Sequence, residues 1–242
     1  MGKLTGKTAI VTGAGRGIGR GIARGLAREG ASLLLTARSE NELNSAASEI
    51  RALGAEVIIF PTDVTEEKNV EALFARVDQQ FGRLDLLVNN AGAFDGGPLD
   101  ELSLEAWDKV IAVNLRAPFL CTRAAMRRMK PQGAGRIINI GSISAQRVRF
   151  GSAPYSASKH GIWGLTQVTA LEGREHGITC CCLHPGNIQV ERRLTDRVED
   201  AEPMMSVDEI AEVAVLMATL PPHVEMLEAI VLPTEQLYVG RG

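Results

Sequence analysis

The 242-residue sequence is poor in aromatic side chains and contains no block of like charge. Phe, Trp and Tyr together make up 4% of the residues, so the core must be built from aliphatic side chains. The 26 basic and 29 acidic residues are interspersed and leave a net charge of −3. Without a basic cluster, nucleic acid is not an expected partner.

Long apolar runs and cysteine motifs are also missing. No apolar run approaches the roughly 18 residues of a membrane span, and the first residues do not resemble a signal peptide. The four cysteines, three of them consecutive at 180–182, form neither a disulfide framework nor a CxxC metal site. Because adjacent strand residues point to opposite faces, we expect the triplet to fill the core. The four histidines lack metal-ligand spacing, and a cytoplasmic, reducing location without membrane or metal is expected.

Short apolar runs alternate with helical patterns along the chain. We expect strands at 8–13, 31–37, 56–63, 84–92, 135–142, 178–186 and 226–233. We expect helices at 17–29, 39–53 with Ser39 as N-cap, 66–81, 103–130, 153–175, and from Ser206, where Ser206 and Glu209 match a capping box. Strands that are apolar throughout are typical of parallel sheets covered on both faces. The pattern predicts an α/β fold, a single-domain, Rossmann-like, doubly wound parallel sheet of about seven strands over residues 1–242.

A glycine-rich turn follows the first strand, with the sequence TGAGRGIG at 12–19. Its glycines match G-x-x-x-G-x-G rather than the GxGxxG of many dinucleotide sites. Glycines allow a tight turn close to a pyrophosphate, and the following helix offers free N–H groups to the anion. We expect dinucleotide contacts here, and a purely structural turn is the alternative. The candidate residues are Gly13, Gly15, Arg16, Gly17, Ile18 and Gly19.

The end of the second strand bears on the choice of cofactor. NAD-binding sites usually place an acidic residue there to hold the ribose 2′-hydroxyl. This chain has Thr36, Ala37 and Arg38 instead, and its next acid is Glu40. Arg38 and Arg16 could converge on a 2′-phosphate, for which arginine is well shaped. NADP(H) is therefore favoured over NAD(H), and two solvated surface arginines are the alternative.

Tyr155 and Lys159 lie four residues apart in the expected helix at 153–175. Positions i and i+4 share a helical face, so the phenol and the ammonium can be neighbours. A neighbouring positive charge favours the phenolate form, which makes the pair a candidate acid/base device. Taken alone, the pair is better explained as an ordinary surface contact.

Seven motifs in register carry a resemblance that covers nearly the whole chain. The sequence resembles the short-chain dehydrogenases/reductases, in the NADP-dependent branch with chains near 250 residues. Any one of the motifs is weak, and their order along one α/β pattern is the strong signal. They are Thr12–Gly19, Asp63-Val64, NNAG at 89–92, Asn114, Ser142, Tyr155-x-x-x-Lys159 and Pro185-Gly186.

The resemblance implies a catalytic group of four residues. Tyr155 would be the general acid in carbonyl reduction and the base in alcohol oxidation. Lys159 would support the phenolate and bind the nicotinamide ribose. Ser142 would hold the substrate oxygen, unless it only caps the next segment. Asn114 would hold a water in a proton relay to the lysine, and a satisfied structural amide is its alternative.

The resemblance also assigns contacts to the cofactor. Asp63 and Val64 would meet the adenine ring, and Asn89 would brace the sheet. The remaining family positions would line the cofactor path or face the nicotinamide, the last of them by its backbone. They are Asn90, Ala91, Gly92, Pro185, Gly186 and Ile188.

Two places depart from the family pattern. Many members have a threonine for the carboxamide five residues beyond Pro185, where this chain has Val190, so that contact is lost or supplied by Thr195. The C-terminal LEAIVLPTEQLYVGRG replaces a common DGG-like turn and could touch another subunit or a ligand. A short, charged substrate lid is expected near 187–205. Phe94, Ser144, Gln146 and Phe150 could border the pocket.

The leading hypothesis is an NADP(H)-dependent oxidoreductase that moves a hydride between nicotinamide and a small carbonyl or secondary alcohol substrate. A keto-acyl thioester, a small ketone, a sugar and a steroid-like alcohol all stay open. The alternative is a catalytically silent dinucleotide-binding protein with a regulatory or redox-sensing role. By resemblance we expect a homodimer or, in preference, a homotetramer paired through the helices at 103–130 and 153–175.

Overall fold

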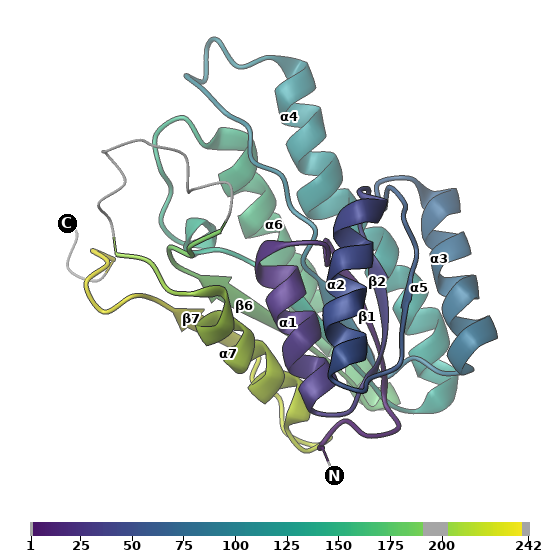
Figure 1. Cartoon of the computed structure of the whole chain (residues 1–242). Helices are drawn as coiled ribbons and strands as arrows, with labels where there is room; N and C mark the ends of the chain where they lie inside the picture. Colours follow the sequence, from purple (N-terminus) through teal and green to yellow (C-terminus); the bar gives the residue numbers. More distant parts are fainter. Residues whose placement is uncertain (1, 191–202, 239–242) are drawn as a thin grey trace.

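Seven parallel strands form one sheet in the computed structural model, which describes residues 2–190 and 203–238. The strand order is β3-β2-β1-β4-β5-β6-β7, so the chain winds outward from β1 and then outward again from β4 (Figure 1). The predicted doubly wound α/β fold is confirmed. The strands are β1 (Thr8–Thr12), β2 (Ser32–Thr36), β3 (Val57–Ile59), β4 (Leu86–Asn89), β5 (Gly135–Ile140), β6 (Ile178–Pro185) and β7 (Glu228–Val231).

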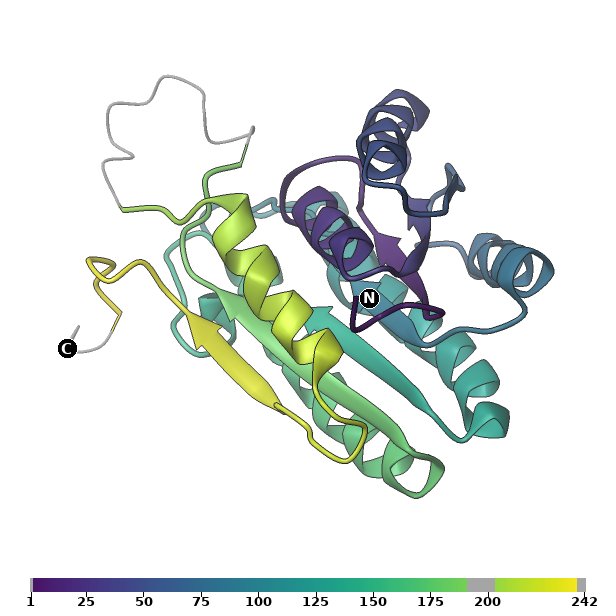
Figure 2. The ribbon, with the colours of Figure 1, turned by 60° about the horizontal axis from the view of Figure 1, so that its bottom comes forward.

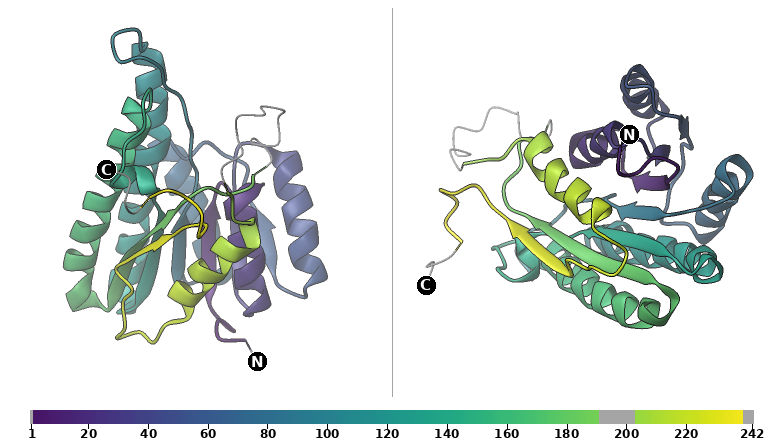
Figure 3. Two further views of the ribbon diagram at one scale, coloured as in Figure 1. Left: turned by 90° about the vertical axis from the view of Figure 1, so that its left-hand side faces the viewer. Right: turned by 90° about the horizontal axis from the view of Figure 1, so that it is seen from below.

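Helices cover both faces of the sheet (Figures 2 and 3). One face carries α1 (Gly17–Arg28), α2 (Glu40–Ala52) and α7 (Val207–Thr219), and the other carries α3 (Glu67–Phe81), α5 (Ala117–Gln132) and α6 (Ala153–Gly173). Within the described residues, no helix has the length and apolar character needed to cross a bilayer.

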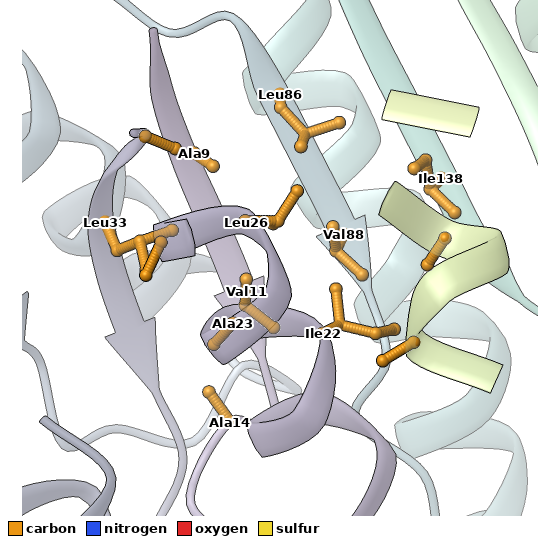
Figure 4. Packing of buried hydrophobic residues seen from close by; sticks show 14 of the residues in the cluster. Ala9, Val11, Ala14, Ile22, Ala23, Leu26, Leu33, Leu86, Val88 and Ile138 are labelled. Carbon is orange, nitrogen blue, oxygen red and sulfur yellow. The ribbon is translucent and has the colours of Figure 1, made fainter. Parts of the chain in front are cut away.

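The core is aliphatic and follows the period of two along each strand. Ala9 and Val11 of β1 pack under α1, whereas Ile10 between them belongs to the cluster on the opposite face. Figure 4 shows Ile22 and Leu26 of α1 against these strands. Both side chains are fully buried, and burial of one such side chain stabilises a fold by about 1.5–3 kcal/mol.

The cysteine triplet lies in β6 and fills the core as predicted. Cys180 packs in the cluster under α3 and α5, and Cys181 packs in the cluster under α1 and α7. Burial raises the pKa of the Cys121, Cys181 and Cys182 thiols to about 12. These thiols are therefore protonated and unreactive in the folded chain.

Two predicted helix starts are confirmed by their capping bonds. The Ser39 side chain accepts from the backbone N–H of Glu42 at the start of α2. Ser206 and Glu209 exchange side-chain and backbone bonds at the start of α7, which completes the capping box.

The expectation of one regular helix over 103–130 is wrong. Ser103 caps a helix α4 (Leu104–Ile111), a π-helical turn follows over Ala112–Arg116, and α5 runs on to Gln132. A π turn admits one extra residue per turn and is frequent at functional sites. Here the wide turn carries Asn114, which is almost fully buried.

Candidate active site

A cavity of about 1020 Å³ lies at the C-terminal ends of the strands. This is where ligands bind in open α/β sheets. Most of the candidate residues from the sequence meet there, although they are spread over 176 positions of the chain (13 to 188). Those that line the cavity are Gly13, Gly15, Arg16, Gly17, Ile18, Arg38, Asp63, Val64, Asn90, Ala91, Gly92, Ser142, Tyr155, Lys159, Pro185, Gly186 and Ile188.

The glycine-rich turn joins β1 to α1 at the floor of the cavity. A Cβ on Gly19 would lie 2.4 Å from the Gly13 carbonyl oxygen and 2.3 Å from Asn90 Nδ2, so only glycine fits there. The Asn90 amide donates to the Thr12 and Gly13 carbonyls at 2.9 and 3.1 Å and holds the turn in place. At the start of α1, no hydrogen bond from the Arg16 side chain caps the helix. The free N–H groups there fit a pyrophosphate.

The rim of the cavity at the end of β2 contains two arginines and the start of α2. Arg16 and Arg38 both line it, next to Ser39 at the N-terminus of α2. Glu42 also lines this rim, and its carboxylate lies 3.5 Å from Arg16 Nη1. The rim therefore carries two cations and one anion, and its strand end has no acidic side chain.

Asp63 and Asn89 have partners within the protein. Asp63 Oδ1 accepts from the backbone N–H and the hydroxyl of Thr65 at 2.9 and 2.8 Å, which turns the chain towards α3. Asn89 donates to Thr122 and to Asn139 on the next strand, at 3.1 and 2.8 Å. Asn89 thus braces the sheet as expected, and the adenine contact of Asp63 stays a prediction.

Tyr155 and Lys159 face the cavity from the first turns of α6. The Lys159 ammonium is buried, donates to the Ile140 carbonyl at 2.8 Å, and lies 5.5 Å from the centre of the Tyr155 ring. The tyrosine ring is half-buried and meets Phe94 edge-on, with 5.3 Å between the ring centres. The two side chains are therefore the neighbours that their spacing predicts.

Ser142 lies two residues after the end of β5 and lines the same cavity. Its hydroxyl accepts from the backbone N–H of Ser144 at 3.1 Å and caps a short 3₁₀ turn over Ile143–Ala145. The capping interpretation of this serine is therefore correct. Ser142 also lines the cavity, so a cap and a substrate contact are compatible.

Asn114 is not among the described residues that line the cavity. Its amide oxygen accepts from the Ala93 N–H at 2.7 Å, and its Nδ2 donates to the Ala93 carbonyl and to Ser158 at 2.9 and 3.2 Å. These bonds are those of a satisfied structural amide. The water-relay role of Asn114 stays a prediction.

Sequence reasoning did not foresee that the C-terminal segment contacts residues in and beside the site of its own chain. Gln236 Oε1 accepts from the backbone N–H of Asn187 at 2.9 Å, beside the predicted nicotinamide end. The Tyr238 hydroxyl donates to Gln146, which follows the loop that bears Ser142. Val190 lines the cavity, whereas Thr195 and residues 191–202 of the expected lid lie outside the described residues.

One arginine and one histidine at the site were also not assigned from the sequence. Arg149 lines the cavity, and its Nη2 donates to Asn187 Oδ1 at 3.3 Å. His184 is buried behind Ser142. No local pattern marks either residue, because their partners lie 38 and 42 positions away. Within 2–190 and 203–238, no cluster of three His, Cys, Asp or Glu is placed to hold a metal ion.

The fold and the cavity together define an α/β protein built to bind a dinucleotide. A family model described as short chain dehydrogenase matches residues 7–201. A gluconate 5-dehydrogenase of Gluconobacter oxydans is 38% identical over 195 residues, covering 81% of this chain and 75% of that protein. An uncharacterized oxidoreductase of Bacillus subtilis is 36% identical over 234 residues, covering 88% of this chain and 91% of that protein.

A solved structure agrees with these relatives. A metagenomic short-chain oxidoreductase in complex with NADP superimposes with a TM-score of 0.84 at 36% identity, covering 96% of this chain and 99% of that one. The chain belongs to the short chain dehydrogenase family. It is therefore an oxidoreductase that acts on CH–OH or C=O groups of small molecules with a nicotinamide cofactor.

Proposed function

We propose that this protein is an NADP(H)-dependent oxidoreductase in which Tyr155 transfers the proton. The observation that carries the proposal is the buried Lys159 ammonium, 5.5 Å from the Tyr155 ring centre on the wall shared with Ser142. The residues present fit a dinucleotide, because the α1 N-terminus is open and Gly19 leaves no room for a side chain. The bound cofactor would supply or accept the hydride.

Each residue then has one task at the reacting group. The Ser142 hydroxyl orients the substrate oxygen, and the Tyr155 hydroxyl gives that oxygen its proton in reduction or removes it in oxidation. Lys159 stabilises the phenolate that remains after proton donation. The Ile140 carbonyl fixes the direction of the Lys159 side chain. Pro185, Gly186 and Ile188 line the end of the cavity where the nicotinamide would lie.

The choice of NADP(H) rests on the rim above β2. Arg16 and Arg38 suit a 2′-phosphate, and the start of α2 adds its N–H groups. The solved relative in complex with NADP supports the same choice. Glu42 works against it, and its ion pair with Arg16 reduces that repulsion.

A small polar hydroxy or oxo compound is the proposed substrate class. Ser144, Arg149 and Asn187 bring polar groups to the substrate end, where Arg149 can pair with a carboxylate. The gluconate 5-dehydrogenase relative makes gluconate with NADP⁺ the first compound to test.

Replacement of Tyr155 by Phe tests the mechanism. NADPH consumption is followed with a panel of small ketones and keto acids, and gluconate oxidation is followed with NADP⁺. We expect Tyr155→Phe to lower kcat by about 10²-fold or more, while the NADPH Kd changes less than about twofold. Leu53→Ala, at the exposed end of α2, serves as the control.

Two outcomes decide against the proposal. An unchanged kcat in the phenylalanine variant would remove Tyr155 from the mechanism. A wild-type protein that binds NADPH tightly but turns over none of the panel would favour the regulatory alternative.

A further inference from the structure

His184 is a fully buried histidine of β6 that lies directly behind Ser142. Its Nδ1 is 2.9 Å from the Ser142 carbonyl oxygen and 3.2 Å from the Ser142 backbone nitrogen. The same carbonyl accepts from the Ala145 N–H at 2.9 Å. The imidazole and the 3₁₀ turn therefore hold one backbone group from two sides.

The space around the imidazole is closed. A Cβ on Gly141 would lie 2.5 Å from His184 Nδ1 and 2.8 Å from Cys182 Sγ, so the position directly after β5 needs glycine. The Trp163 ring of α6 meets the imidazole edge-on, with 5.9 Å between the ring centres. Packing therefore fixes the ring beside the serine backbone.

The other ring nitrogen faces the last strand. His184 Nε2 is buried and has no hydrogen-bond partner among the described residues, although Glu228 Oε1 of β7 lies 3.4 Å away. Gln146 Nε2 donates to that carboxylate oxygen at 2.5 Å. A buried polar atom with no partner is rare in folded proteins and calls for a functional explanation.

The titratable groups that face the imidazole are Lys159 of α6, Glu228 of β7 and the protonated Cys182 thiol of β6. Burial lowers the pKa of His184, and the Ser142 carbonyl and Glu228 partly offset this effect. A neutral imidazole has one N–H proton. The contact from Nδ1 to the Ser142 carbonyl oxygen, at 2.9 Å, is shorter than the 3.2 Å from Nδ1 to the Ser142 backbone nitrogen and so favours the tautomer with the proton on Nδ1.

Beyond Glu228, the contacts continue to the C-terminal segment. Gln146 also accepts from the Tyr238 hydroxyl, and the Arg147 guanidinium lies 5.7 Å from the centre of the Tyr238 ring. The loop after Ser142 is thus held by β6, β7 and the tail together.

We propose that His184 is a positioning residue that holds the backbone of Ser142, and that Glu228 and Gln146 tie this support to the C-terminal segment. The expected effect on kcat rests on the proposed function. The contact between His184 and the Ser142 backbone does not depend on that function. Because misplacing a catalytic group by about 1 Å can cost about 10²-fold in rate, loss of the support affects kcat.

The kinetic test uses two substitutions that differ in one hydrogen bond. His184→Ala removes the donor to the Ser142 carbonyl, and we expect kcat to fall about tenfold or more while the NADPH Kd stays within about twofold. His184→Asn places an amide N–H near the position of Nδ1–H, and we expect it to recover most of kcat. His223→Gln, at an exposed histidine, is the matched control.

A second test does not depend on turnover or on its substrate. Hydrogen exchange at the Ala145 amide should speed up in His184→Ala and, to a smaller extent, in Glu228→Ala, whereas exchange in β1 should not change. Glu228 is only partly buried, so Glu228→Ala is expected to fold even if His184→Ala does not.

Either of two results overturns the inference. One is unchanged exchange at Ala145 in these variants, and the other is an Asn variant no more active than the Ala variant. If Tyr155→Phe abolishes turnover and the His184 variants remain fully active, the inference fails and the proposed function stands.

Discussion

At the residue scale, the rim above β2 decides which nucleotide the cavity prefers. Arg38 is exposed at the strand end where an acidic residue would otherwise bind the ribose hydroxyls. Arg16 shares the rim but is partly engaged by Glu42. We therefore expect Arg38 to be the side chain with the greatest effect on binding of a 2′-phosphate.

Arg38→Asp should erase the preference for NADPH. We expect the wild-type protein to bind NADPH at least about tenfold more tightly than NADH, a difference of about 1.4 kcal/mol. The new carboxylate repels a 2′-phosphate and accepts bonds from ribose hydroxyls, so the two Kd values should converge. Fluorescence titration measures both. Arg76→Asp on α3 makes the same charge change outside the cavity lining, and an equal effect there would assign the loss to net charge alone.

Residues with local signals were predictable, and those with distant partners were not. Tyr155 and Lys159 are found by their spacing, and Gly13 and Gly19 by the turn they form. His184 has no such signal, because it contacts the backbone of Ser142, just after β5, and the side chain of Glu228 on β7. Only the parallel pairing of β5, β6 and β7 brings these three residues together.

At the scale of elements, the strands were predictable because each is an apolar run, whereas the wide turn before α5 was not. Val110, Asn114, Ala117 and Cys121 are all buried and follow the spacing of a regular helix. The extra residue of the π turn therefore leaves no trace in the hydrophobic pattern. It appears in the backbone, where the Ala117 N–H donates to the Ala112 carbonyl five residues earlier.

The capping box of α7 gives a prediction for the stability of that element. Ser206→Ala removes the side-chain acceptor for the Glu209 N–H, and we expect a loss of about 1 kcal/mol in the free energy of unfolding. Urea denaturation measures the loss. Ser48→Ala changes an exposed serine inside α2 and should cost nothing. Equal stability of the two variants would mean that the α7 cap does not contribute.

At the scale of the whole molecule, large apolar side chains remain exposed on the helices expected to pair between subunits. Leu104 of α4 is 72% exposed, and Val168 and Leu171 of α6 are 52% and 63% exposed. Exposed apolar side chains that gather on one surface mark sites of association. The expected homodimer or homotetramer stays a prediction, and these side chains are where it can be tested.

Light scattering at micromolar concentration should therefore find no single monomeric species. Val168→Glu combined with Leu171→Glu places two charges on α6 and should shift the protein towards monomers, because burying an unpaired charge is costly. Leu53→Glu, at an apolar position exposed on α2, should leave the assembly intact. A wild-type monomer would contradict the expected assembly.

The position of β7 at the sheet edge has a consequence for how the protein is made. Ribosomes release the chain from its N-terminus, so β1 to β6 can pair before Glu228 and Tyr238 have left the exit tunnel. Until then β6, which bears His184, lacks its outer neighbour β7, and the loop after Ser142 lacks its contact to Tyr238. A nascent chain would thus form its nucleotide pocket before the support behind Ser142 is complete.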